Sequence, residues 1–99
     1  MARLIAFSRR STVQLQKILT FYDERNGSDE YSRRLLRNLM ADLEQLALMP
    51  TASSPSTRDD VRFFYLMGFT IIFRYDEHKL TVLSIRSSAR QPLRMYQKK

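Results

Sequence analysis

The sequence predicts an α+β fold in two layers, with a helical hairpin packed on one face of a small antiparallel sheet in the order β-α-α-β-β-β. Two patterns lead to this prediction. Apolar residues at helical period occupy the first half of the chain, and short runs rich in Val, Ile, Phe, Tyr and Thr occupy the second half. Turn residues separate these runs, which is typical of an antiparallel meander. The 99 residues are expected to form a single domain.

The first strand and the first helix are predicted from the residues up to Gly27. The short apolar run Arg3–Phe7 predicts a strand that pairs with the later sheet. Ser8 is a candidate N-cap for a helix over residues 9–26, because its hydroxyl can accept an unpaired backbone N–H of the first turn. Gly27 should end that helix, since glycine readily takes the positive φ of a C-terminal cap. The apolar stripe of this helix consists of Leu15, Ile18, Leu19 and Tyr22.

A second helix follows a short joint, so the two helices should form an antiparallel hairpin. Ser28 is its candidate N-cap, and Asp29 and Glu30 lie where the helix dipole favours acidic side chains. The helical period continues until Pro50, which cannot extend a helix. The apolar positions of this helix are Tyr31, Leu35, Leu36, Leu39, Met40, Leu43, Leu46 and Ala47.

A polar loop over residues 51–60 precedes the three predicted strands, which occupy Val61–Met67, Phe69–Tyr75 and Leu80–Ile85. Successive side chains of a strand alternate between its two faces. In the middle strand, the set expected to face the core is Phe69, Ile71, Phe73 and Tyr75. The alternation is less regular in the third strand. Because both helices should cover one face, the other face, with its basic strand ends, is the expected binding surface.

The charge of the chain predicts an anionic partner. There are 17 Lys and Arg against 10 Asp and Glu, a net charge of +7, and no acidic residue precedes Asp23 or follows Glu77. The partner could be a nucleic acid, an acidic protein or a membrane surface, or the charge could simply form a solvated surface. The second helix carries Arg33, Arg34 and Arg37, which fit either a phosphate-binding ridge or a solvated face. Neither helix has the basic and aromatic faces of a membrane-surface helix, so no membrane partner is expected.

Several classes of chemistry are excluded by composition. The chain has no cysteine, hence no disulfide, and a reducing cytoplasm is the expected location. No apolar stretch approaches the length that crosses a bilayer. The one histidine, His78, lies in an expected turn beside Asp76 and Glu77, without further ligands for a metal ion. The only glycines, Gly27 and Gly68, form no phosphate-binding loop, which argues against nucleotide-dependent chemistry. No metal and no cofactor is therefore expected from the histidine and the glycines together.

The chemistry that remains rests on arginines and a tyrosine. Metal-independent cleavage of RNA by its own 2′-hydroxyl needs a base, an acid and cations around the phosphate, and positioned Arg and Tyr side chains can supply them. The candidates are Arg62, Arg74, Arg86, Arg90 and Tyr96. The alternative is that the arginines only attract an acidic partner.

Three stretches carry a resemblance to a known family. Residues 22–31, YDERNGSDEY, place an aromatic, an acid and a glycine before the second helix. Residues 68–73, GFTIIF, resemble the strand motif G-[YF]-R-[LI]-[VI]-[YF], and residues 85–92, IRSSARQP, resemble a closing strand with an Arg-rich end. In this order and spacing, the stretches resemble the RelE/ParE superfamily of bacterial toxins from type II toxin-antitoxin systems. The resemblance covers nearly the whole chain.

The resemblance implies that residues 1–99 are one toxin domain, neutralised by a cognate acidic antitoxin in a toxin-antitoxin hetero-oligomer. ParE-like members poison DNA gyrase, whereas RelE-like members cut messenger RNA on the ribosome. In the RelE-like nucleases the strand motif carries an arginine where this sequence has Thr70, and the preceding strand carries lysines where this sequence has only Arg62. Arg90 and Tyr96, in contrast, match the nuclease positions.

Two target classes therefore stay open, and a ParE-like protein that binds a target such as gyrase is favoured. In that case Arg74, Arg86, Arg90 and Arg94 are the expected target- or partner-binding residues. In the alternative, a ribosome-dependent ribonuclease, the catalytic residues would be Arg62, Arg90 and Tyr96. A non-catalytic nucleic-acid-binding module is a third possibility, although no RRM-type aromatic motif supports it.

Overall fold

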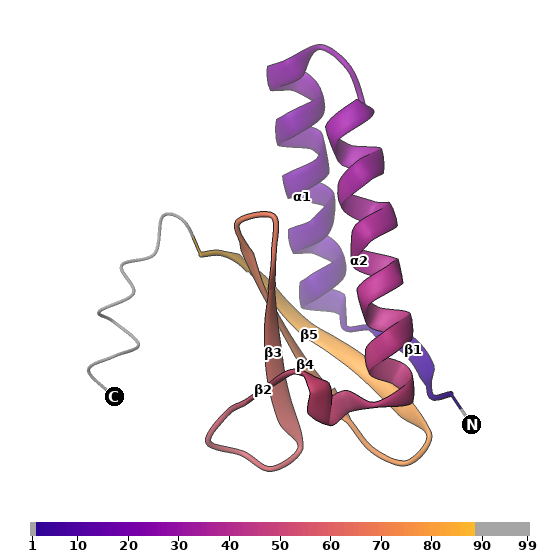
Figure 1. Cartoon of the computed structure of the whole chain (residues 1–99). Coiled ribbons are helices and arrows are strands. Elements are labelled where there is room, and N and C mark those ends of the chain that lie inside the picture. The colour runs from indigo at the N-terminus through magenta and orange to yellow at the C-terminus, as the bar shows by residue number, and fades with distance from the viewer. Residues whose placement is uncertain (1, 89–99) are drawn as a thin grey trace.

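The computed structural model describes residues 2–88, and Figure 1 shows two long helices on one side of a sheet. The helices are α1 (Arg9–Asn26) and α2 (Glu30–Leu48), and a short 3-10 helix follows at Pro50–Ala52. The strands are β1 (Leu4–Phe7), β2 (Ser54–Pro55), β3 (Val61–Leu66), β4 (Phe69–Tyr75) and β5 (Lys79–Ser87). The predicted α+β fold is confirmed.

The sheet is mixed rather than antiparallel as predicted. Its strand order is β1-β5-β4-β3-β2, and β1 runs parallel to β5 while the other pairs are antiparallel. The helical hairpin returns the chain to the start of β1, where the Arg3 N–H donates to the Ala47 carbonyl at 3.2 Å. Strands β3, β4 and β5 then alternate in direction, and β5 therefore runs parallel to β1. The predicted loop over residues 51–60 also contains β2, which extends the sheet beyond β3.

Helix α1 has the predicted bounds and caps. The Ser8 side chain accepts a hydrogen bond from the backbone N–H of Ser11 at 3.1 Å. At the other end Gly27 has a φ of 68°, and its N–H donates to the Asp23 carbonyl. This left-handed conformation carries a steric cost for residues with a Cβ atom, which explains the glycine.

Helix α2 begins one residue later than a Ser28 cap requires, so that prediction is wrong. Asp29 occupies the N-cap position and makes no side-chain cap hydrogen bond. Its carboxylate instead pairs with the Arg33 guanidinium one turn later, at 3.3 Å. The predicted end of α2 before Pro50 is confirmed.

The core lies between α2 and the helix-covered face of the sheet. Five of the predicted apolar positions of α2 are buried, namely Leu35, Leu39, Leu43, Leu46 and Ala47. The sheet contributes Phe69, Ile71, Phe73, Leu80, Val82 and Ile85. The predicted stripe of α1 packs against this cluster with half-buried side chains. The predicted facing of β4 is therefore confirmed, with Tyr75 half-buried at its end.

A β-bulge explains the irregular alternation in the third strand. Ile72 pairs with Ser84 whereas Phe73 pairs with Val82, so Leu83 is an extra residue in β5. The bulge changes which side chains face the core, because a one-residue shift exchanges the two faces of a strand. Val82 and Ile85 are consequently both buried although they are three residues apart.

The turn between β4 and β5 is held by an exposed carboxylate, and we expect it to make stability depend on pH. The Asp76 side chain accepts hydrogen bonds from the backbone N–H groups of His78 and Lys79 at 2.7 and 2.8 Å. These bonds favour the ionised form and hold the pKa of Asp76 below its ordinary value of 3.8. Because the pKa is lowered on folding, the contribution to stability is complete above that value and is lost as pH falls through the lower folded value.

This prediction can be tested by urea unfolding between pH 5 and pH 2. Asp76→Asn keeps an acceptor oxygen but does not titrate, so the gap in unfolding midpoint between it and the wild type should narrow as the pH falls. Glu77→Gln, at the neighbouring exposed position, is the control. The gap in unfolding midpoint between this variant and the wild type should not narrow in the same way. A gap that stays constant down to pH 2 would contradict the assigned role of Asp76.

Candidate macromolecule-binding surface

The face of the sheet turned away from the helices forms a surface of its own. Residues paired directly across an antiparallel sheet lie on the same face, so the register assigns each side chain. We define the open face by eight residues of β3, β4 and β5: Val61, Phe63, Tyr65, Thr70, Ile72, Arg74, Thr81 and Arg86. None of these side chains is acidic. Ser84 pairs with Ile72 next to the bulge but is not included, because it is buried and its hydroxyl donates to the Gln14 side chain of α1. Within residues 2–88, both helices lie on the other side of the sheet (Figure 1).

A tight turn sets the register of this face. Met67 and Gly68 join β3 to β4 with φ values of 51° and 84°, the positive values that a two-residue hairpin of the favoured type requires. Tyr65 therefore pairs with Thr70 across the hairpin. The Gly68 carbonyl also accepts a hydrogen bond from the Ser88 N–H at 2.9 Å, which ties the turn to the end of β5.

Two aromatic side chains of the open face did not figure among the sequence-based candidates. Tyr65 is 61% exposed, and Phe63 is half-buried. Their rings lie edge to face with centroids 5.6 Å apart. The neighbouring Phe64 and Leu66 pack against the core instead. The alternation of side chains along β3 predicts this difference. Phe63 and Tyr65 are two residues apart and point to one face, whereas Phe64 and Leu66 point to the other.

The structure brings two of the predicted binding residues to the open face. Arg74 and Arg86 are both exposed there, on β4 and β5. Arg74 makes no ion pair or side-chain hydrogen bond within residues 2–88. The other predicted residues, Arg90, Arg94 and Tyr96, lie outside the described part of the chain.

Arg62, a predicted catalytic candidate, points to the opposite side of β3. It pairs with the core residue Phe73, and its guanidinium donates to the Ser53 hydroxyl at 3.1 Å and to the carbonyls of Thr51 and Ser53. These bonds hold the segment before β2 against the sheet. Arg62 is thus separated from Arg74 and Arg86 by the sheet itself.

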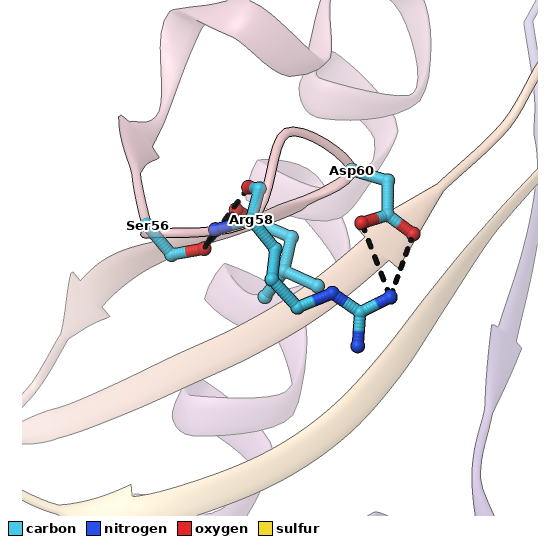
Figure 2. A network of polar contacts seen from close by, with 4 residues as sticks. Ser56, Arg58 and Asp60 are labelled. Carbon is cyan, nitrogen blue, oxygen red and sulfur yellow. Dashed lines mark hydrogen bonds and ion pairs between the residues drawn. The ribbon is translucent and has the colours of Figure 1, made fainter.

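A polar network orders the loop between β2 and β3 at the edge of the open face (Figure 2). The Ser56 hydroxyl accepts from the Arg58 N–H at 3.1 Å and donates to the Val61 carbonyl at 2.6 Å. The Arg58 guanidinium pairs with the Asp60 carboxylate at 3.4 Å. The Asp60 carbonyl accepts the Tyr75 N–H at 3.1 Å. Asp60 offsets the charge of Arg58, and the exposed Asp59 leaves this loop with one net negative charge beside the open face.

The arginines of α2 are mostly engaged with their own helix. Arg33 pairs with Asp29, and the Arg34 guanidinium lies over the Tyr31 ring, 5.6 Å from its centroid. Burial is also the main reason that the pKa of Tyr31 lies above its ordinary value of 10.0. Arg37 is exposed. This arrangement fits a solvated helix face better than a phosphate-binding ridge.

Other kinds of site are not evident in the described residues. Within residues 2–88, no three His, Cys, Asp or Glu side chains gather as a metal ion would require. Neither α1 nor α2 is long and apolar enough to cross a membrane.

One comparison with known proteins identifies a family, and a second finds a similar fold. Residues 5–92 match the family described as "ParE toxin of type II toxin-antitoxin system, parDE". A solved structure of the chromosomal ParDE TA system from P. aeruginosa is similar to this chain, with a TM-score of 0.70 and 19% sequence identity. The similarity covers 87% of this chain and 96% of that chain, and at this identity it concerns the fold. No curated protein matches the chain.

Proposed function

Because the chain belongs to the ParE toxin family of type II toxin-antitoxin systems, we propose that it is a toxin that binds a macromolecular target such as DNA gyrase. A cognate acidic antitoxin neutralises it in a toxin-antitoxin hetero-oligomer. The toxin meets both its target and its antitoxin in the cytoplasm. The toxin needs no cofactor and works by binding rather than by catalysis.

The open face is the observation that supports this proposal most directly. It presents the exposed Arg74 and Arg86 without any acidic side chain, in a chain with a net charge of +7. Such a surface attracts an anionic segment and steers its approach. An acidic antitoxin and a target that carries nucleic acid both have the complementary charge.

The ribonuclease alternative receives less support from the geometry. Thr70 lies on the open face where the nuclease motif has an arginine. Arg62 cannot replace that cation without leaving Thr51 and Ser53, to which it donates hydrogen bonds. Removal of a cation at a reacting phosphate typically costs several kcal/mol of transition-state stabilisation. The ribonuclease alternative then depends on Arg90 and Tyr96, and its further cation would have to come from Arg74 or Arg86 on the open face.

The test is induction of the chain alone in a bacterial host, with plasmid supercoiling and messenger-RNA integrity measured together. We expect relaxed or broken DNA and intact RNA. In an assay with purified gyrase, Arg74→Gln should raise the concentration for half-inhibition by about fivefold or more, because an arginine within an interface often contributes ~1 kcal/mol or more. Arg37→Gln removes the same charge from α2 and should change little.

Two results would contradict the proposal. RNA cut within minutes with supercoiling intact would identify a ribonuclease. Equal losses of gyrase inhibition in Arg74→Gln and Arg37→Gln would show that the open face does not contact the target. Arg62→Gln serves as a further control, since it should lower stability through the lost bonds to Ser53 while leaving the inhibition by folded protein unchanged.

A further inference from the structure

The aromatic pair on the open face is not required by the core. The core is filled from the other side of β3, where Phe64 packs against Phe73 with ring centroids 6.2 Å apart. Phe63 and Tyr65 instead hold each other edge to face on the exposed side, and Tyr65 remains 61% exposed. An exposed aromatic pair on an uncovered sheet offers flat π surfaces to a ligand that has flat rings of its own.

A cation lies within reach of this pair. Phe63 pairs with Ile72, two residues before Arg74 on β4, so Phe63 and Arg74 are diagonal neighbours on one face. Diagonal neighbours across an antiparallel pair are roughly 7–8 Å apart, which long side chains span. Arg74 is exposed and makes no ion pair within the described residues. A ligand that stacks on the rings would therefore place an attached anion close to an available guanidinium.

From this juxtaposition we propose that the open face binds single-stranded nucleic acid, with bases stacked on Phe63 and Tyr65 and a phosphate held by Arg74. Unpaired bases expose their π faces, whereas a duplex hides them in its stack. The lack of acidic side chains on the open face suits a phosphate backbone. An acidic peptide would use the arginine but would gain little from the exposed rings. The proposal holds whichever macromolecule the toxin acts on.

The test is fluorescence anisotropy with the full chain and labelled 12-nucleotide oligo-dT and oligo-U, with a 12-base-pair duplex for comparison. Tyr65→Leu and Phe63→Leu keep apolar side chains but remove the stacking surface. Each should weaken binding by roughly 5- to 150-fold, the range that stacking of one base on an aromatic ring spans. Phe21→Leu is the matched control, because Phe21 is also exposed, at 52%, but lies on α1. It should bind like the wild type.

Salt dependence tests the phosphate contact separately. Arg74→Gln should lower the slope of log affinity against log salt concentration by about 0.7, the value for one phosphate contact on a single strand. Arg37→Gln, with the same change in net charge, should leave the slope unchanged. Circular dichroism and the urea midpoint of each variant establish that it is folded.

Four outcomes would overturn the proposal. Unchanged affinity in both leucine variants would show that the rings are not used. Equal binding of the duplex and the single strands, or equal effects of Arg74→Gln and Arg37→Gln, would indicate unspecific attraction to a basic protein. Binding of labelled poly-glutamate that depends on Tyr65, without binding of the oligonucleotides, would assign the open face to an acidic protein segment instead.

Discussion

Replacement of Phe73 by alanine should lower the free energy of unfolding by about 3–5 kcal/mol. Phe73 is 0% exposed at the centre of the sheet and pairs with Val82. Its ring lies between those of Phe64 and Tyr75, with centroid distances of 6.2 and 6.4 Å. The variant loses the transfer free energy of the ring and leaves a cavity that close-packed neighbours fill only in part. Since small domains are stable by only about 5–15 kcal/mol, much of the margin would disappear.

Urea unfolding followed by far-UV circular dichroism measures this loss. Phe73→Leu keeps most of the volume and should cost much less. Ile72 is the neighbouring residue and is half-buried on the open face. Ile72→Ala should therefore also cost less unfolding free energy than Phe73→Ala. A loss below 1 kcal/mol for Phe73→Ala, at an unchanged denaturant slope, would show that the core is not organised around this ring.

Replacement of Gln14 by leucine should cost about 1–3 kcal/mol through one unpaired backbone group. Strand β1 pairs with β5 only as far as Val82, so the edge of β5 beyond that point lacks a neighbouring strand. The Gln14 side-chain oxygen takes that place and accepts the Ile85 N–H at 2.7 Å, with the Ser84 hydroxyl 3.3 Å away. Leucine has a similar size but no acceptor, so a part-buried N–H would lose its partner.

The control for this prediction is Gln16→Leu, an exposed position on the same helix. It should change stability by a few tenths of a kcal/mol at most, as substitutions at exposed positions usually do. Amide hydrogen exchange provides a local readout, because the Ile85 amide should exchange faster in Gln14→Leu. Two results would show that Gln14 does not stabilise the edge of β5. One is an equal loss of unfolding free energy in the two variants, and the other is an Ile85 amide that stays equally protected from exchange in Gln14→Leu.

Much of the fold could be predicted because its signals are local. The bounds of α1 follow from a hydroxyl at Ser8 and a glycine at Gly27, each acting on neighbouring backbone groups. The buried face of β4 follows from strict alternation. The resemblance to RelE/ParE toxins rests on three short stretches, and the ParE family match confirms it. The Ser28 cap prediction was wrong because the next residue, Asp29, belongs to a type that is equally favoured at the N-cap and occupies that position.

The candidate surface could be predicted only in part. An uncovered basic sheet face was expected, and Arg74 and Arg86 both lie on it. Arg62 was grouped with them from composition, but it pairs with Phe73 and therefore faces the other way. Residue type alone does not assign a face. Phe63 and Tyr65 were missed for the same reason, because their exposure depends on the register of β3 against β4.

Neighbouring residues and composition were enough to predict the two helices, the three main strands, the basic charge and the similarity to a toxin family. Three features became visible only in the folded domain: the parallel pairing of β1 with β5, the bulge at Leu83 and the acceptor role of Gln14. The pairing of β1 with β5 and the hydrogen bond of Gln14 join residues about 70 positions apart, Gln14 and Ile85 among them. Local propensity carries no information about such pairs, since the partner of a strand edge is chosen by the packing of the whole domain.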